Sequence, residues 1–594
     1  MEANGSAPSF KRSGSGLMAR PRVVWPMAFR TLALACPNCG AEGEKPFHLT
    51  VEFATGPETR QTSSVLRCPE CTALFYETRI PPDYAEEAML ERGRVPFYLQ
   101  QGAGLSVITR PLARIRVPAG GTYAEIGCGF GFGLDYARHA KGWNAHGIDP
   151  AGLSALGQRM LGVSIDRRYL GDDEPALAGR HDVVMASETL EHVVSPAGFI
   201  RVLRALLRPG GILVLSTPDA ADMRAETPPG ILVPLLSPGL HLIFQTRDSL
   251  RALLEQAGFA HVALDKDGHS LVAFASSHPL DLEADVTVLR AEYLGYLERR
   301  AQEFGREDDL FLAFAGRALL EAVNDGAYEQ ARRLRPLLDG ACRARFGAPL
   351  EALGARAVAE RGLPLEQLAR RMPLSLGGLL YADAILRLAS GEDRATLGVC
   401  FSRAEAAAHA LQDALGGLAM EDGMTEDIAW TARAEALLCA ATAGDARVTT
   451  GLAALPAAPD PLNGAARRRA ILERALVSLV NASHYQIASE LVQLTGFDDA
   501  PWAAPQGDAP DGDAAQYDAP LTDSRRDALF CLAVLDALHD DPARLERARG
   551  RFHRVRCLPG VAEAPGAAEG LFAAASRGET AALARLRAAG AAVS

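Results

Sequence analysis

The sequence predicts an α/β domain that lies between a small cysteine-rich module and an all-α C-terminal half. Three observations indicate this order. Two Cys-x-x-Cys turns fall within residues 36–71, a glycine-rich turn joins a short apolar run to a helical pattern after residue 122, and Ala, Leu, Arg and Glu recur with helical spacing beyond about residue 279. At 594 residues the chain is too long for one hydrophobic core, so several folded units are expected.

The composition is that of a folded, acidic protein. Apolar residues make up 48% of the chain and charged residues 23%, which excludes global disorder. Lys and Arg number 61 against 73 Asp and Glu, so the net charge is −12. Such a chain lacks the general attraction to phosphates that nucleic-acid binding uses, and a nucleic-acid partner is not expected.

The sequence also bears on the compartment. Apart from the paired turns, the cysteines are scattered singly, unlike those of a disulfide-rich secreted domain. Residues 1–30 are basic and rich in Gly and Ser but lack the apolar run of a secretory signal, and we expect them to form a disordered tail. Four prolines interrupt the uncharged stretch 227–246, which favours a loop over a transmembrane helix. A cytoplasmic protein is therefore expected.

The cysteine turns predict a metal site. Cys36 and Cys39 form one Cys-x-x-Cys turn, and Cys68 and Cys71 form another after a 28-residue stretch with short β-like runs. Each turn directs two thiolates at one point, and two turns complete the tetrahedron that Zn²⁺ prefers. Redox dithiols and a site that has lost its metal are the alternatives, and neither explains two matched turns. Four protein ligands leave no position for catalysis, so we expect a structural zinc ribbon over residues 31–80.

A glycine-rich turn carries the next signal. The run Glu125-Ile-Gly127-Cys-Gly129-Phe-Gly131 follows a strand-like segment and precedes a helical pattern. It does not fit the dinucleotide fingerprint, because the third glycine position falls on Phe132 or Leu134. An acid followed by alternating glycines resembles the first motif of class I S-adenosylmethionine-dependent methyltransferases.

That resemblance implies a Rossmann-like domain with a seven-stranded sheet over residues 81–278, with S-adenosylmethionine as cofactor. Bare glycines would let the backbone lie against the methionine and ribose, while Glu125 orders the ammonium group. Asp149 ends the next predicted strand and can accept both ribose hydroxyls. In the family an acid after the third strand approaches the adenine amino group, and of Asp172 and Asp173 we choose Asp172. The expected cofactor-binding residues are Glu125, Gly127, Gly129, Gly131, Asp149 and Asp172.

The fourth predicted strand, residues 181–187, leads to the candidate catalytic residues. In the family this edge faces the methyl group and the acceptor, and Glu188 or His192 could supply the base that O-methylation needs. Alternatively, Glu191 and His192 cap or orient the following helix. His241 ends a Pro-rich loop, residues 218–239, whose length is typical of a lid, and it either reaches the acceptor or packs within the loop. The catalytic candidates are Glu188, His192 and His241.

The run from Glu188 to Arg208-Pro-Gly-Gly211 resembles the branch that holds ubiquinone-type O-methyltransferases and many sugar- and polysaccharide-pathway methyltransferases. This branch implies a small-molecule or glycan-linked acceptor. A zinc module before such a domain also resembles sugar C-methyltransferases and, more distantly, ribosomal-RNA methyltransferases, and the acidic charge favours the sugar comparison. A methyltransferase-like scaffold, or a protein or RNA methyltransferase guided by the zinc module, is the alternative.

The C-terminal half reads as helical repeats. Residues 317–334 match residues 474–491 at eight of eighteen positions, and both read as helix, Asn-containing turn, helix. We expect a repeat-like region over 279–497. An acidic linker is expected over 498–523, where seven aspartates, four prolines and no Lys or Arg occur, followed by a helical segment over 524–594. This half carries no catalytic constellation and is expected to bind a partner protein or mediate self-association.

Overall fold

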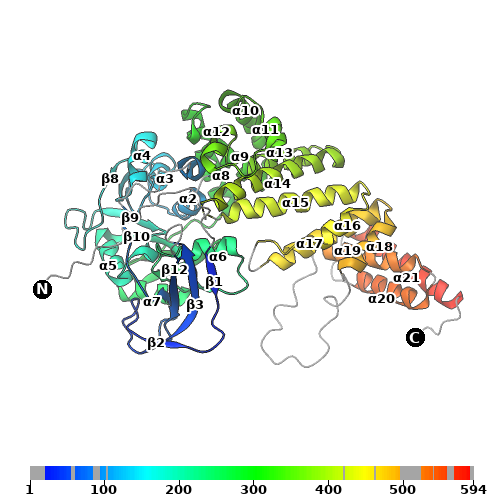
Figure 1. Cartoon of the computed structure of the whole chain (residues 1–594), viewed down its shortest axis with the longest axis horizontal. Helices are drawn as coiled ribbons and strands as arrows, with labels where there is room; N and C mark the ends of the chain where they lie inside the picture. The colour runs from blue at the N-terminus through cyan, green and yellow to red at the C-terminus, as the bar shows by residue number, and fades with distance from the viewer. Residues whose placement is uncertain are drawn as a thin grey trace. The chain divides into compact units, whose positions relative to one another are not determined.

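The computed structural model describes residues 21–54, 60–84, 94–101, 105–418, 420, 422–459, 463–495, 523–539, 541–557 and 567–588. The chain groups into two compact units, one formed by residues 1–386 and 406–428 and the other by residues 387–405 and 429–594. The helices after residue 279, which run from green to red in Figure 1, are therefore shared between the units.

A seven-stranded sheet forms the centre of the α/β domain, in the order β12-β13-β10-β9-β6-β7-β8, which confirms the predicted seven strands. Neighbouring strands from β10 to β8 are parallel, and β13 is antiparallel to both β10 and β12. The bounds are β6 (Thr122–Ile126), β7 (Asn144–Ile148), β8 (Ile165–Asp166), β9 (His181–Ser187), β10 (Leu207–Pro218), β12 (His261–Asp267) and β13 (Ser270–Ser276). The chain reverses direction across the sheet between β6 and β9, the switch point where such sheets bind ligands.

β9 is buried along its whole length. All seven of its residues are buried, as expected for a parallel strand that is covered on both faces; its central residues 183–186 are apolar, and His181, Asp182 and Ser187 lie at its ends. On one face, leucines of α5 (Pro196–Leu206) and α7 (Arg247–Gln256) pack against β6, β9, β10 and β13. Ser195 caps α5 with Pro196 at its first position, and Thr246 and Ser249 form a capping box at the start of α7. α3 (Phe132–His139) and α4 (Gly152–Leu161) follow β6 and β7.

The N-terminal strands form a second sheet, in the order β1-β3-β4-β5-β11 with β2 paired to β3. Its bounds are β1 (Arg22–Val24), β2 (Thr31–Ala33), β3 (Glu44–Ala54), β4 (Arg60–Arg67), β5 (Leu74–Tyr76) and β11 (Ile243–Phe244). We call residues 31–76 the tetracysteine module. Of the tail predicted over residues 1–30, residues 1–20 lie outside the described residues. β1 lies within the rest of that tail and pairs with β3.

The segment predicted as a loop over 218–239 contains a helix, α6 (Pro229–Leu236). Its prolines obscured this helix in the sequence, although Pro229 lies in the first turn, where proline is tolerated. Ile231, Leu232, Leu235 and Leu236 are buried in one core with Leu49, Val51, Val65 and Leu74 of the tetracysteine module. The apolar run is therefore a packing surface for the module.

Helices α8 to α10 pack in sequence, and α9 also contacts α1. The helices not yet given are α1 (Arg94–Gln100), α2 (Leu105–Ala113), α8 (Val286–Glu303), α9 (Asp309–Asn324), α10 (Tyr328–Phe346), α11 (Leu350–Arg356), α12 (Leu365–Arg371), α13 (Leu376–Ala389), α14 (Arg394–Gly416), α15 (Gly423–Thr442), α16 (Val448–Ala453), α17 (Gly464–Asn481), α18 (Tyr485–Thr495), α19 (Asp523–Ala537), α20 (Pro542–Cys557) and α21 (Ala567–Ala588). The matched repeats occupy equivalent positions, because α9 and α17 both end at the shared Asn and α10 and α18 both begin at the shared Tyr.

A buried ion pair joins the helices to the α/β domain. Arg300 of α8 donates from Nε and Nη2 to the two carboxylate oxygens of Asp135 on α3, at 2.9 and 2.8 Å. Tyr296 donates to the same carboxylate at 2.7 Å. Because the Asp135 side chain is fully buried and that of Arg300 is 4% exposed, α8 is fixed directly to the helix that follows the glycine turn.

The predicted acidic linker lies outside the described residues except for Asp523, which begins α19. In the second unit α19 packs against α17 and α20, and α20 against α21. Within the described ranges no single helix is long and apolar enough to cross a membrane. The bent pair α12 and α13 passes that test by length and composition alone.

Gly157 of α4 offers a test of this packing. A Cβ added there would lie 1.7 Å from the carbonyl oxygen of Phe130, which is backbone and cannot rotate away. We expect Gly157→Ala to lower the melting temperature measured by thermal unfolding. Gly295→Ala in α8 is the control, because its Cβ would meet only the end of Arg299 and alanine favours a helix by about 1 kcal/mol. Equal melting temperatures would contradict the packing described.

Candidate functional site

A cavity of about 920 Å³ lies at the carboxyl edge of the seven-stranded sheet. Its wall includes the ends of β6 and β7, the segment after β9, residues 168–174 and the Pro81-Pro82 segment. Five of the residues predicted from the sequence meet here: Gly127, Asp149, Asp172, Glu188 and His192. The structure thus brings cofactor-side and acceptor-side candidates to one place.

The glycine turn requires its glycines for two physical reasons. Gly127, Gly129 and Gly131 have φ of 73°, 52° and 93°, a left-handed conformation that other residues rarely adopt. Space is also lacking, because a Cβ on Gly127 would lie 2.4 Å from Oγ1 of Thr189. Gly127 lines the cavity, whereas Gly131 precedes α3 as its N-cap.

Asp149 holds the turn in place. One carboxylate oxygen accepts the Gly129 amide and the other accepts the Ala151 amide, each at 2.7 Å. Burial raises the pKa of Asp149, and these two amide bonds oppose that shift. Each carboxylate oxygen has a second lone pair, and the residue lines the cavity, so it can still accept hydroxyl groups of a ligand.

Glu125 lies behind the glycine turn. Its side chain packs against Gly133, where an added Cβ would approach Oε2 to 2.3 Å, and Oε2 has no hydrogen-bond partner. Burial raises the pKa of this carboxyl to about 8. Glu125 is not among the residues that line the cavity. Its carboxylate contacts Gly133, at the start of α3.

Asp172 and Asp173 follow β8 along the chain, and both are exposed and line the cavity. The next residue, Glu174, is held by Arg168 at 2.6 and 3.1 Å. This ion pair anchors the segment that carries the two aspartates.

Glu188 follows β9 in a strained conformation. Its φ is 47°, unusual for a residue with a Cβ, and such strain recurs at functional sites. The backbone amide donates to the Ser216 carbonyl at 3.0 Å, while Oε1 is buried without a partner. Burial raises the pKa of Glu188, partly offset by hydrogen bonds from Ser216 and Ser270.

Glu191, His192 and His241 converge on one point, which we call the Glu-His-His cluster. Nε2 of His192 and Nε2 of His241 lie 3.8 and 3.9 Å from Oε1 of Glu191, and the two imidazole rings are 4.7 Å apart. The Glu191 side chain is fully buried, and its Oε1 has no hydrogen-bond partner. Glu191 is absent from the predicted catalytic set. Its place at the centre of the cluster depends on His241, which lies fifty residues later in the sequence and which the fold brings next to His192.

Neighbouring groups fix the orientation of each member. Nδ1 of His241 lies 2.7 Å from the Leu235 carbonyl, so this nitrogen carries the proton and Nε2 is bare. The Tyr84 hydroxyl donates to the Leu240 carbonyl at 3.2 Å and accepts from Nδ1 of His192 at 2.5 Å, which leaves Nε2 of His192 bare as well. Thr217 donates to the other oxygen of Glu191 at 3.0 Å. No sequence pattern marked Tyr84.

The cluster has the donor set of a divalent-cation site. Two bare imidazole nitrogens and one buried carboxylate oxygen lie within 4.8 Å of one another. Two histidines and a carboxylate, each held by an outer hydrogen bond, are a common way to bind a transition metal. Burial lowers the pKa of His192 to about 4 and that of His241 to about 3, so both rings are neutral. Of the three, only His192 lines the cavity.

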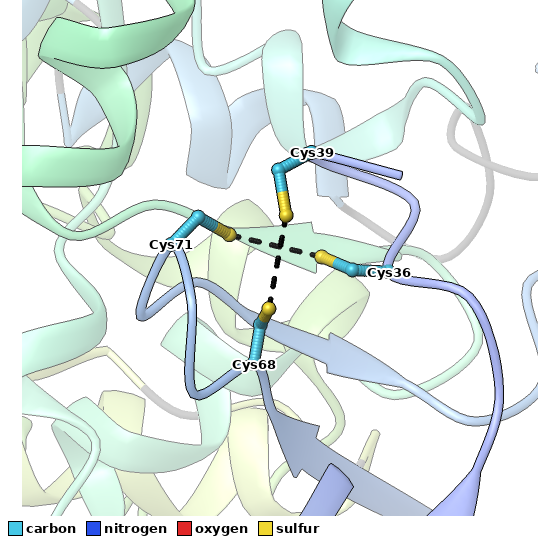
Figure 2. Close-up of side chains that lie close together, drawn as sticks. All are labelled: Cys36, Cys39, Cys68 and Cys71. Carbon is cyan, nitrogen blue, oxygen red and sulfur yellow. Dashed lines mark hydrogen bonds between the residues drawn. The ribbon is translucent and has the colours of Figure 1, made fainter. Parts of the chain in front are cut away.

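The four predicted metal-site cysteines do meet (Figure 2). The Sγ atoms of Cys36 and Cys71 are 3.7 Å apart, and those of Cys39 and Cys68 are 3.8 Å apart. A tetrahedron with Zn–S bonds of about 2.3 Å has edges of about 3.8 Å, so the arrangement fits a tetrahedral thiolate site.

Comparison with known proteins supports the same reading of the α/β domain. A family model described as a methyltransferase domain matches residues 103–264. The ubiquinone biosynthesis O-methyltransferase of Pseudomonas aeruginosa (strain UCBPP-PA14) is 40% identical over 105 residues, which cover 17% of this chain and 45% of that protein. The protein of the same name from Ruegeria pomeroyi is 32% identical over 188 residues, which cover 29% of this chain and 73% of that protein.

Among solved structures, an S-adenosylmethionine-dependent methyltransferase from Mesorhizobium loti is 20% identical, with a TM-score of 0.24, and covers 28% of this chain and 95% of that one. The chain spans less than half the length of the Pseudomonas relatives, and the family model leaves out the tetracysteine module and the helices after β13. Because the Ruegeria relative is matched over most of its length, and the sheet and glycine turn agree with that match, the chain belongs to the family of S-adenosylmethionine-dependent methyltransferases.

Proposed function

We propose that this protein transfers a methyl group from S-adenosylmethionine to an oxygen atom of a small-molecule acceptor. The observation that carries the proposal is that Gly127 and Asp149 line the same cavity as Glu188 and His192. The names of the curated relatives support O-methylation of a small molecule. Within that class we favour a sugar or glycan-linked acceptor, as the sequence motifs indicate.

On the cofactor side, Asp149 is the residue proposed to bind the ribose and Asp172 the adenine, with the Gly127 backbone against the methionine. When bound, the cofactor supplies an electrophilic methyl group on sulfur. Asp149 already positions the glycine turn through the Gly129 amide, so one carboxylate both shapes the site and presents lone pairs to it. Glu125 supports the turn from behind.

On the acceptor side, the Glu-His-His cluster is proposed to activate the acceptor hydroxyl. It can do so in two ways that experiment separates: His192 takes the proton at its bare Nε2, or the three residues hold a divalent cation that lowers the pKa of the hydroxyl. Glu188 completes the wall beside it.

Two broader expectations remain proposals. We propose a cytoplasmic location, which is supported by the finding that none of the nine cysteines whose side chains the structure describes forms a disulfide. The helical hairpins α9–α10 and α17–α18 are proposed to bind a partner protein or mediate self-association, since repeated helix pairs offer extended surfaces.

We propose that Cys36, Cys39, Cys68 and Cys71 bind one structural Zn²⁺. Elemental analysis of the purified protein should find about one zinc per chain. Cys68→Ser should lose the zinc and lower the melting temperature, because metal binding and folding of such modules are coupled. Cys342→Ala removes a buried cysteine outside the cluster and should keep the metal. A metal-free, stable wild-type protein would contradict the assignment.

Calorimetric titration with S-adenosylhomocysteine tests the cofactor site. We expect wild-type protein to bind it and Asp149→Ala to weaken binding by at least about tenfold, the loss typical of a hydrogen bond to a charged group. Asp166→Ala is the matched control, because this carboxylate also ends a strand but does not itself line the cavity, and its partner Arg168 is held by Glu174 as well. Folded wild-type protein that fails to bind would sink the enzyme proposal in favour of a methyltransferase-like scaffold.

Transfer of radiolabelled methyl groups to a panel of catechols and nucleotide sugars tests the acceptor side. Glu191→Gln and His241→Ala should lower turnover by about 10² to 10⁴ and leave S-adenosylhomocysteine affinity unchanged. His146→Ala, at a half-buried histidine on β7 that does not line the cavity, should retain activity. Loss of activity on chelation with recovery in Mg²⁺ or Mn²⁺ indicates a cation, and indifference to chelation indicates proton transfer to His192. Full activity in both cluster variants would contradict the assignment.

A further inference from the structure

The tetracysteine module and the segment that carries His241 share a sheet. β5 of the module pairs antiparallel with β11, Phe75 opposite Ile243 and Leu74 opposite Phe244. The Tyr76 amide also donates to the Leu242 carbonyl at 2.9 Å. His241 lies two residues before β11, so a strand of the cysteine module fixes the backbone on its C-terminal side.

A buried chain of hydrogen bonds runs from the cysteines to the same segment. Asn38 lies inside the first Cys-x-x-Cys turn and is 5% exposed. Its Nδ2 donates to Sγ of Cys71 at 3.6 Å, and its Oδ1 accepts from Nε2 of Gln245 at 2.8 Å. Gln245, which is fully buried, then accepts the Ser249 hydroxyl of α7 at 2.7 Å. Asn38 thus contacts a sulfur ligand on one side and the residue after β11 on the other.

The opposite side of the segment is held by the Glu-His-His cluster itself. The Leu242 amide donates to the carbonyl of Glu191 at 2.7 Å. Thr72, in the second cysteine turn, adds a hydroxyl contact to Thr246 at 2.6 Å. The segment that follows His241 is therefore held by Glu191 on one side and by the two cysteine turns on the other.

We propose that Asn38 is a positioning residue that couples the tetracysteine site to His241. With the sulfur atoms held in their tetrahedron, Asn38 keeps its amide aimed at Gln245, and this contact holds β11 so that Nε2 of His241 faces Glu191. Loss of the tetrahedron frees the first turn and leaves the buried Gln245 amide without its acceptor, a costly state that the segment relieves by moving. The consequence for catalysis rests on the proposed function, whereas the coupling does not.

Hydrogen exchange measured by mass spectrometry tests the coupling without an acceptor. The variants are Asn38→Ala, Gln245→Ala and the double variant, with Asn144→Ala as an exposed control whose amide contacts only the Gly120 carbonyl. We expect exchange at residues 242–246 to rise about fivefold in each single variant, the effect of one hydrogen bond. The double variant should add little to either single variant, because both remove one shared contact.

Two further readouts separate positioning from folding. Asn38→Ala and Gln245→Ala should keep their zinc and their affinity for S-adenosylhomocysteine. Methyl transfer to whichever catechol or nucleotide sugar the wild type methylates should fall by about 10-fold to 100-fold, as it does when a residue that orients a site residue is lost. Removing the metal from wild-type protein should reproduce the exchange pattern at 242–246. Exchange at the glycine turn should not change in any variant.

Unchanged exchange at residues 242–246 in both single variants overturns the proposal. If Asn38→Ala loses its metal, Gln245→Ala decides, because no hydrogen bond described for Gln245 reaches a cysteine. Raised exchange in a protein that methylates no probe even as wild type supports the coupling and counts against the proposed function alone.

Discussion

Complete burial of the Glu191 carboxylate constrains the Glu-His-His cluster and the strand ends around it. A carboxylate without water must be satisfied by protein groups or by a bound cation. Thr217 at the end of β10 donates to one oxygen, and the other oxygen has no hydrogen-bond donor and faces the bare Nε2 atoms of the two histidines. The backbone of Glu191 also accepts the Leu242 amide. One residue therefore ties the end of the parallel sheet to the segment that leads into β11.

This constraint explains why the N-terminal module folds onto the α/β domain. The segment that must return His241 to Glu191 is apolar, and its leucines would be exposed without the strands of the module. Shared burial of α6 with β3, β4 and β5 holds the module against the segment that carries His241, while β11 completes its sheet. The tetracysteine module thus packs beside the segment that leads from α6 to β11.

The cofactor side depends on different supports. Asp149, at the end of β7, accepts the Gly129 amide and so fixes the glycine turn. Arg300 of α8 donates to Asp135 and so fixes α3, the helix that follows the turn. A buried ion pair is sensitive to loss of either partner, since the remaining charge is left without compensation. Helix α8 therefore supports the helix that follows the glycine turn.

Local sequence determined the parts of this protein that need only local chemistry. Alternating glycines after Glu125 require a left-handed turn, Asp149 marks a strand end, paired Cys-x-x-Cys turns indicate a tetrahedral site, and the repeated Asn and Tyr mark helix ends. Tertiary structure alone decided the rest. The role of Glu191 depends on His241, fifty residues away, and α6 is a helix because the module buries it, despite its prolines. Glu125 packs against Gly133, where a side chain would leave it no room, and does not line the cavity. Such contacts join residues distant in the chain, and their energy comes from shared burial that no local pattern records.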